Sequence, residues 1–324
     1  MTTDEQETSS KSPAVPEFSV ILSCYNEENN IDEFHARLSK TMESMGRSYE
    51  MIFVNDASTD RTFAKLESIF EKDEHVTVID LFTNCGQPAA MTAGFTHARG
   101  EKFVFIDCDL QLDPEEVPML VEEYDKGYDL VSGYRKKRKD RLSRVVFSII
   151  LNLILRKACR VKLRDFGCNF NIVNGRIFRG GEYGAFKPFR PIYVVSSVQR
   201  YSEVPVSHHP PKYGKSGWSF PRLAIYAMDN LFGIFQRPFI TMSGVCFLLA
   251  LLLSIVVPLN WLLPFSVLAK IVRYLFCDLN VFSLLLIVGM LFAVGEFVTR
   301  NYMVSQQHPA YIIRTILRRP GPEA

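Results

Sequence analysis

The sequence lacks several patterns that would assign it to a well-defined class of proteins. Its 7 cysteines include no C-x-x-C pair and no His-rich ligand spacing, which argues against structural zinc and against a disulfide framework, and favours reduced thiols in a cytosolic domain. No G-x-G-x-x-G follows the first apolar run, and no G-x-x-x-x-G-K-[ST] occurs, so neither a dinucleotide fingerprint nor a P-loop is present. The net charge of +2 over 324 residues indicates no general attraction to nucleic acid.

Residues 1–16 also lack an apolar core, being rich in Ser, Thr, Glu and Pro. They do not contain the hydrophobic region of a signal peptide. Segments with so few apolar residues cannot bury enough surface to fold, and we therefore predict a disordered N-terminus.

What the chain does contain is a regular alternation of predicted strands and helices. Short apolar runs at 18–22, 49–54, 76–81, 103–106 and 129–134 predict strands. Helices are predicted between these runs. The first covers about 30–45, the second runs from a Ser/Asp cluster to about 70, and the third runs from Pro88 to about 98. This alternation predicts an α/β protein with a doubly wound, mostly parallel sheet. Polar residues follow each strand, at the edge where such sheets bind ligands.

Two carboxylates and a glutamine follow the run at 103–106. On an extended backbone, side chains two residues apart point to the same side, so Asp107, Asp109 and Gln111 should present oxygen ligands together. Mg²⁺ and Mn²⁺ prefer such ligands and usually share them with substrate phosphates. We predict a site for one of these ions here; a solvated turn is the alternative reading of an isolated Asp-x-Asp.

A basic segment at 135–144 leads into an apolar run at 145–155. A helix of about 11 residues is too short to cross a bilayer but can lie in its interface. Flanking cations attract anionic headgroups by about 1 kcal/mol each. We expect interfacial helices near 142–160 and 219–235, with an ordinary buried helix beside a solvated loop as the alternative for the first.

Two longer apolar segments follow, at about 239–257 and 279–297, and the first contains no charged residue. At 1.5 Å per residue each is long enough to cross a bilayer. Cationic residues are more numerous outside these segments than in the loop that joins them, so both termini are expected in the cytoplasm. We predict a cytosolic domain at 17–235, two transmembrane helices within 236–300 and a cytosolic tail at 301–324. Buried core helices are the alternative.

Five polar motifs occur along the first two-thirds of the chain. They are Cys24-Tyr25-Asn26-Glu27, Asn55-Asp56-x-Ser58-x-Asp60, Asn84-x-Gly86-Gln87, Asp107-x-Asp109-Leu110-Gln111-x-x-Pro114-Glu115 and Asp165-Phe166-Gly167-Cys168. Taken together, they resemble the motifs of the inverting family 2 glycosyltransferases, and the similarity runs from about Phe18 into the second apolar segment. More narrowly, they resemble the polyprenyl-phosphate glycosyltransferases, a group that includes dolichyl-phosphate mannose synthases, bactoprenol glucosyltransferases and undecaprenyl-phosphate aminoarabinose transferases.

The resemblance implies a GT-A domain at the inner membrane that moves a sugar from a nucleotide-sugar, UDP-glucose or a related UDP-sugar, to undecaprenyl phosphate. It implies nucleotide contacts from Tyr25, Glu27, Asp56, Gly86, Gln87 and Asp107, and metal ligation by Asp109, Gln111 and Asp107. It also implies phosphate contacts from Arg135, Arg138, Lys212, Lys215 and Ser216, with Asp165, Asp109 and Arg135 in catalysis. Related enzymes are often multimers, and no nucleic-acid partner is expected.

The acceptor chemistry leads to a specific expectation for Asp165. A phosphate monoester has its second pKa near ~6 and is largely dianionic at neutral pH, so it barely needs a general base. We expect Asp165 to orient an arginine or a sugar hydroxyl instead. The sequence departs from the family pattern at Pro211 and Gly217, where many members carry Arg and Lys.

Two other functions fit parts of the sequence. A processive polysaccharide synthase would normally carry Gln-x-x-Arg-Trp and more membrane spans, whereas this chain has only Gln199-Arg200-Tyr201. A catalytically inactive sugar-nucleotide sensor or membrane scaffold is the other, and the retained acidic motif argues against it. UDP-linked amino sugars and GDP-mannose remain open as donors. We expect a surface role for His208 and His209, which lie in a Pro-flanked turn.

Overall fold

The computed structural model describes residues 15–136, 156, 162–179, 194–195, 198–210, 212, scattered positions between 283 and 305, and 309–319. The chain divides into two compact units. The first comprises Met1–Ile234 together with Pro309–Ala324, and the second is Phe235–His308. The chain therefore leaves the first unit and later returns to it.

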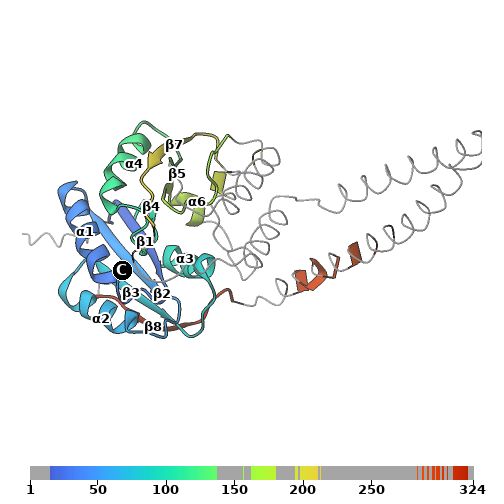
Figure 1. The fold of residues 1–324 in the computed structure, drawn as a ribbon, viewed down its shortest axis with the longest axis horizontal. Helices are drawn as coiled ribbons and strands as arrows, with labels where there is room; N and C mark the ends of the chain where they lie inside the picture. The colour runs from blue at the N-terminus through green and yellow to red at the C-terminus, as the bar shows by residue number, and fades with distance from the viewer. Residues whose placement is uncertain are drawn as a thin grey trace, which may run out of the picture. The chain divides into compact units, whose positions relative to one another are not determined.

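The described part of the first unit contains an eight-stranded sheet in the order β7-β5-β6-β4-β1-β2-β3-β8 (Figure 1). Its strands are β1 (Phe18–Cys24), β2 (Tyr49–Asn55), β3 (Val76–Leu81), β4 (Lys102–Phe105), β5 (Leu130–Arg135), β6 (Asn171–Asn174), β7 (Tyr201–Val206) and β8 (Ile313–Leu317). Strands β4, β1, β2 and β3 are mutually parallel, and β5 pairs in parallel with β7. Strand β6 runs antiparallel to β4 and β5, and β8 antiparallel to β3. The predicted mostly parallel sheet is confirmed, as are the five predicted strands.

Helices cover both faces of this sheet. They are α1 (Ile31–Ser44), α2 (Thr62–Lys72), α3 (Gln87–Thr96), the 3₁₀ turn η1 (Pro114–Glu116), α4 (Val117–Tyr124) and α6 (Arg176–Arg179). Alternate residues of β1 serve the two faces, as strand geometry requires. Val20 and Leu22 pack in one core with α1, α2 and α4, while Ile21 packs in another with α3 and α6 (Figure 1).

The close packing of α3 on the sheet requires a glycine. A Cβ on Gly94 would lie 2.5 Å from Cγ2 of Ile21 and 3.2 Å from Cγ2 of Val54. A side chain at this position would therefore push α3 away from β1 and β2, whose carboxyl ends carry the site described below.

The segment predicted as a cytosolic tail contains β8, at the outer edge of the sheet beside β3. The sequence analysis assigned it no secondary structure. Its side chains are only partly buried or exposed, so its apolar pattern is too weak to reveal a strand.

Several predictions fall on residues outside those described. These are most of the N-terminal segment 1–16, nearly all of the expected interfacial helices near 142–160 and 219–235, the apolar segment 239–257, and most of the segment 279–297. Among the residues that are described, no helix is both long enough and apolar enough to cross a membrane.

Candidate active site

The loops after β1, β2 and β4 meet at the carboxyl edge of the sheet, and each contains a strained residue. Asn26, Ala57 and Leu110 have φ of 58°, 52° and 57°. A non-glycine residue in this left-handed region costs on the order of 1–3 kcal/mol and persists only where its surroundings impose it. Such strain gathers at functional sites, and here it marks the edge where the sequence predicts one.

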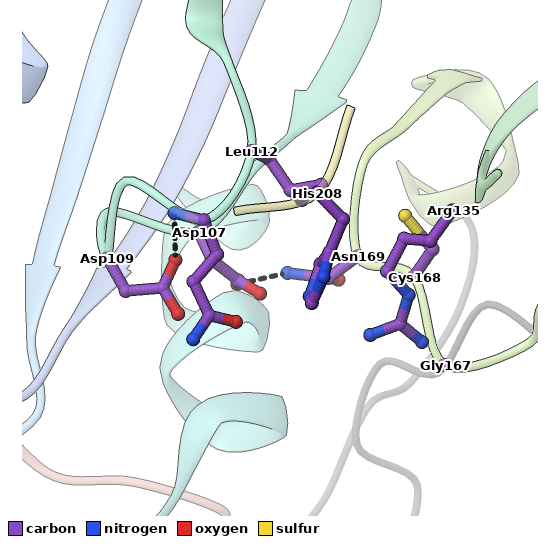
Figure 2. Close-up of a pocket in the computed structure, with 9 residues that line it drawn as sticks. Asp107, Asp109, Leu112, Arg135, Gly167, Cys168, Asn169 and His208 are labelled. Carbon is purple, nitrogen blue, oxygen red and sulfur yellow. Dashed lines mark hydrogen bonds between the residues drawn. The ribbon is translucent and has the colours of Figure 1, made fainter. Parts of the chain in front are cut away.

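An open pocket at this edge collects residues from four distant parts of the chain (Figure 2). It is lined by Asp107, Asp109, Gln111, Leu112, Arg135, Gly167, Cys168, Asn169 and His208. Asp107, Asp109 and Gln111 lie together in this pocket, but for a different geometric reason than the sequence predicts. Strand β4 ends at Phe105, and the chain then turns through Leu110, with the Gln111 N–H donating to Asp109 Oδ1 at 3.0 Å. A turn, and not an extended strand, brings the three side chains together.

Hydrogen bonds orient the first of these carboxylates. Oδ1 of Asp107 accepts from Gln87 Nε2 at 2.5 Å and from Asn169 Nδ2 at 2.8 Å. The sequence analysis missed Asn169, although it follows directly after the motif that ends at Cys168. Continuing that motif by one residue would have included it.

The pocket is a poor environment for so much negative charge. Burial, followed by the charge of Asp109, raises the pKa of Asp107, and burial likewise raises the pKa of Asp109. Burial also raises the pKa of Glu27 to about 7, helped by the charges of Asp109 and Asp107, against the hydrogen bond from Asn30. A bound cation would offset this crowding of carboxylates.

The donor set fits a divalent ion that shares its ligands with a substrate. Within the described residues, no group of three or more His, Cys, Asp or Glu side chains is arranged to hold a metal. Mg²⁺ commonly uses only one or two protein carboxylates and completes its shell with water and substrate phosphates. Asp107, Asp109 and the amide of Gln111 offer hard oxygen atoms of that kind.

Arg135, which lines the same pocket as Asp107 and Asp109, forms a two-pronged ion pair with Asp165. Arg135 Nε donates to Asp165 Oδ2 at 2.7 Å, and Nη2 donates to Oδ1 at 2.9 Å. The side chains are 13% and 8% exposed. A carboxylate whose two oxygens bind one guanidinium is held in a single orientation, as the expectation that Asp165 orients an arginine requires.

Asp56 organises a neighbouring loop. Its carboxylate accepts the N–H of Cys85 at 2.8 Å and the N–H of Gly86 at 2.9 Å. Burial raises the pKa of Asp56, against these two bonds. Gly86 has φ of 84°, a conformation that glycine adopts without strain. Nearby Tyr25 is 47% exposed.

Of the two histidines expected to have a surface role, His209 is exposed, whereas His208 is half-buried and lines the pocket. Its position follows from the docking of the segment after β7. Ser207 N–H and Oγ donate to Glu116, while the His209 N–H donates to Gln111 O at 2.9 Å. The sequence signal that could have predicted this position is the pair His208-His209, which follows shortly after the end of β7.

The predicted phosphate-binding residues are only partly placed. Arg135 lines the pocket, whereas Lys212 Nζ lies 2.5 Å from Oε2 of Glu33 on α1 and is not among the pocket's lining residues. Arg138, Lys215 and Ser216 lie outside the described residues.

Comparisons with known proteins agree on the family. The model of "Glycosyl transferase family 2" matches residues 19–179. The chain is 30% identical over 320 residues to an undecaprenyl-phosphate 4-deoxy-4-formamido-L-arabinose transferase of Klebsiella pneumoniae (strain 342), covering 95% of this chain and 96% of that protein. It is 30% identical over 317 residues to the enzyme of the same name from Edwardsiella ictaluri (strain 93-146), covering 94% and 95%.

A solved structure supports the fold. Glucosyl-3-phosphoglycerate synthase from Mycobacterium tuberculosis, in complex with uridine diphosphate, matches with a TM-score of 0.51 and 18% identity. The match covers 70% of this chain and 81% of that one. The sheet of the first unit is thus GT-A-like.

Proposed function

Since this chain belongs to glycosyl transferase family 2, and matches polyprenyl-phosphate glycosyltransferases over nearly its whole length, we propose that it transfers a sugar from a nucleotide-sugar to undecaprenyl phosphate. The observation that carries the proposal is the pocket in which Asp107 and Asp109 lie with Arg135. Opposite charges placed in this way suit a reaction that brings a phosphate nucleophile to a sugar diphosphate.

The donor is a UDP-sugar in this proposal. The relatives named above act on 4-deoxy-4-formamido-L-arabinose, which supports an amino-sugar donor in preference to UDP-glucose. Glu27, Asp56 and the loop that ends at Gly86 would surround the nucleoside, since they lie at the carboxyl ends of β1, β2 and β3.

Asp107, Asp109 and Gln111 would hold Mg²⁺ or Mn²⁺. When bound, the ion would supply positive charge to the donor diphosphate as it departs. Asn169 and Gln87 keep Asp107 oriented, and the turn at Leu110 keeps Asp109 beside it. Because these contacts hold the carboxylates in place, little reorganisation is needed during the reaction.

The reaction is a displacement at the anomeric carbon. An oxygen of the lipid phosphate dianion forms the new C–O bond to the anomeric carbon. The C–O bond to the nucleoside diphosphate breaks, and the nucleoside diphosphate leaves with the electron pair. Attack from the side opposite the leaving group inverts the configuration of the anomeric carbon. No proton has to leave the nucleophile, since the dianion dominates above pH ~6. Arg135 places a permanent positive charge near the phosphates, and Asp165 fixes its orientation.

We further propose that the first unit lies at the cytoplasmic face of the inner membrane. The pairing of β8 with β3 joins the segments before and after Phe235–His308 in one folded unit. If Phe235–His308 crosses the bilayer, the chain must cross an even number of times, because both flanking segments belong to the same folded unit. Two crossings, at 239–257 and 279–297, agree with that requirement and with the cationic flanks.

A transfer assay tests the proposed function. The purified full chain in lipid nanodiscs would be incubated with undecaprenyl phosphate, Mn²⁺ and a panel of labelled UDP-sugars and GDP-mannose. We expect one lipid-linked monosaccharide from a UDP-amino sugar and none with Asp109→Ala. A polymeric product would indicate a processive synthase, and nucleotide binding without transfer from any donor would indicate a sensor or scaffold; either result would overturn the proposal.

A further inference from the structure

Arg314, on the C-terminal strand β8, binds the end of the neighbouring strand β3. Its Nη1 lies 3.1 Å from Oδ2 of Asp80, and its Nη2 donates to the carbonyl oxygen of Phe82 at 3.2 Å. The Phe82 N–H donates to Ile312 O at 2.9 Å. Both backbone polar groups of Phe82 are therefore held by β8 and the residue before it, and the guanidinium lies 5.3 Å from the centre of the Phe82 ring.

Asp80, which binds Arg314, also binds a residue of β2. It is 1% exposed, and its second oxygen, Oδ1, accepts from Asn55 Nδ2 at 2.6 Å. Asn55 is the residue directly before Asp56, whose carboxylate holds the N–H groups of Cys85 and Gly86. Asp80 therefore receives hydrogen bonds from both of its neighbouring strands.

The segment 80–87 is consequently fastened at three points. Arg314 holds its beginning, Asp56 holds Cys85 and Gly86, and Gln87 at its end donates to Asp107 in the pocket. Between the first two points the exposed Phe82 contributes little packing. Asp80 and Leu81 are buried in β3, where Asp80 also pairs with Asn55 of β2. Phe82 follows the end of the strand, and its backbone is held by Ile312 and Arg314.

From this chain of contacts we infer that Arg314 is a positioning residue for donor binding, although 234 positions along the chain separate it from Asp80. The inference rests on the proposed function, because it takes the loop ending at Gly86 to contact the nucleotide. Arg314 itself touches no substrate. It acts through Asp80 and Phe82 on the backbone of the loop.

A second arginine of the same segment provides a matched control. Arg319 Nη2 donates to the carbonyl oxygens of Phe70 and Glu71, at 3.1 and 2.9 Å, at the end of α2. It fastens the C-terminal segment as Arg314 does but does not contact segment 80–87 in these bonds. If the arginines only anchor β8, their loss should have the same effect.

The test compares Arg314→Ala, Arg314→Lys and Arg319→Ala in the full chain in nanodiscs. Uridine diphosphate affinity would be measured by calorimetry, and KM for donor, KM for acceptor and kcat by the transfer assay. Arg314→Ala loses the hydrogen bonds to the Asp80 carboxylate and to the Phe82 carbonyl oxygen. This loss should weaken uridine diphosphate binding and raise the donor KM by about tenfold. The acceptor KM should not change, Arg319→Ala should match the wild type, and Arg314→Lys should recover part of the loss through Asp80.

The outcomes separate this inference from the proposed function. If the wild type transfers sugar and binds uridine diphosphate, but Arg314→Ala behaves like Arg319→Ala, the positioning role is refuted while the function stands. If the wild type binds no nucleoside diphosphate, the proposed function fails and the inference with it. Should Arg314→Ala not fold, Arg314→Lys decides: unchanged donor KM and uridine diphosphate affinity, at an unchanged melting temperature, would count against positioning, and a selective rise in donor KM would support it.

Discussion

The ion pair between Arg135 and Asp165 permits a sharp test of how the acceptor is activated. In Asp165→Asn, one of the two acceptor oxygens and the negative charge are lost, while the shape of the side chain is kept. The bonds at stake measure 2.7 and 2.9 Å and join the buried Asp165 to the partly buried Arg135. A hydrogen bond to a charged group is worth about 1.5–3 kcal/mol, which corresponds to a fall in kcat/KM of about 10- to 150-fold.

Magnitude alone does not distinguish positioning from proton transfer, because general bases contribute about 10²- to 10⁴-fold. Two further measurements do. If Asp165 acts only through Arg135, then adding Asp165→Asn to Arg135→Lys should cost little beyond the single change. The pH profile of Asp165→Asn between 6 and 9 should also keep the wild-type shape, since the lipid phosphate needs no proton acceptor there.

Transfer of sugar from labelled donor to undecaprenyl phosphate is the assay for both measurements. Asp129→Asn serves as the control, because the side chain of Asp129 forms a long ion pair with the exposed Arg200, at 3.7 Å, and surface pairs of this kind contribute about 0–1 kcal/mol. The positioning role would be refuted if the double variant lost kcat/KM by the product of the two single losses. A residual rate in Asp165→Asn that rises tenfold per pH unit would also refute it.

Three further outcomes are expected. Asp109→Ala should abolish Mn²⁺-stimulated turnover while circular dichroism and melting temperature stay close to wild type; full activity in this variant would disprove the metal assignment. Gly94→Ala should lower the melting temperature, because its Cβ would lie 2.5 Å from Ile21 Cγ2 and overpacking costs about 1–3 kcal/mol; an unchanged melting curve would show that α3 is not closely packed there. The hydrogen bond from Arg47 lowers the pKa of Glu17, so ionised Glu17 stabilises the fold above its unfolded pKa, and that stabilisation is lost as the pH falls through the lower, folded value. The melting temperatures of wild type and Glu17→Gln should therefore differ most near pH 7 and converge in acid, and a constant difference would contradict the assignment.

Local patterns in the sequence were sufficient for the first half of the sheet. Apolar runs at 18–22, 49–54, 76–81 and 103–106 became β1 to β4 with shifts of a few residues at their ends. Helical spacing predicted α1, a Ser/Asp cluster predicted the start of α2, and Pro88 predicted the first turn of α3. Periodicity is a property of neighbouring residues, so it can be read without knowing the fold. The same holds for Asp107 and Asp109, whose position after a buried strand predicted the edge where they lie.

Other parts of the site depend on pairings between distant residues. Strand β8 lies beside β3 although more than 230 residues separate them, and its exposed side chains gave no periodic signal. His208 reaches the pocket only because Ser207 and His209 dock on the loop after Gln111. The register of such contacts depends on how loops close and which backbone groups they satisfy, and neither is visible in a local pattern.

The sequence by itself thus determined the first five strands, the helices α1 to α3 and the acids that follow the fourth strand, since each depends on the chemistry of adjacent residues. Only the tertiary structure decided that a turn at Leu110 unites the acids, that Asp165 binds Arg135, and that Arg314 returns from the far end of the chain to hold Asp80. Those contacts join residues whose separation along the chain is closed by folding, and folding alone sets their geometry.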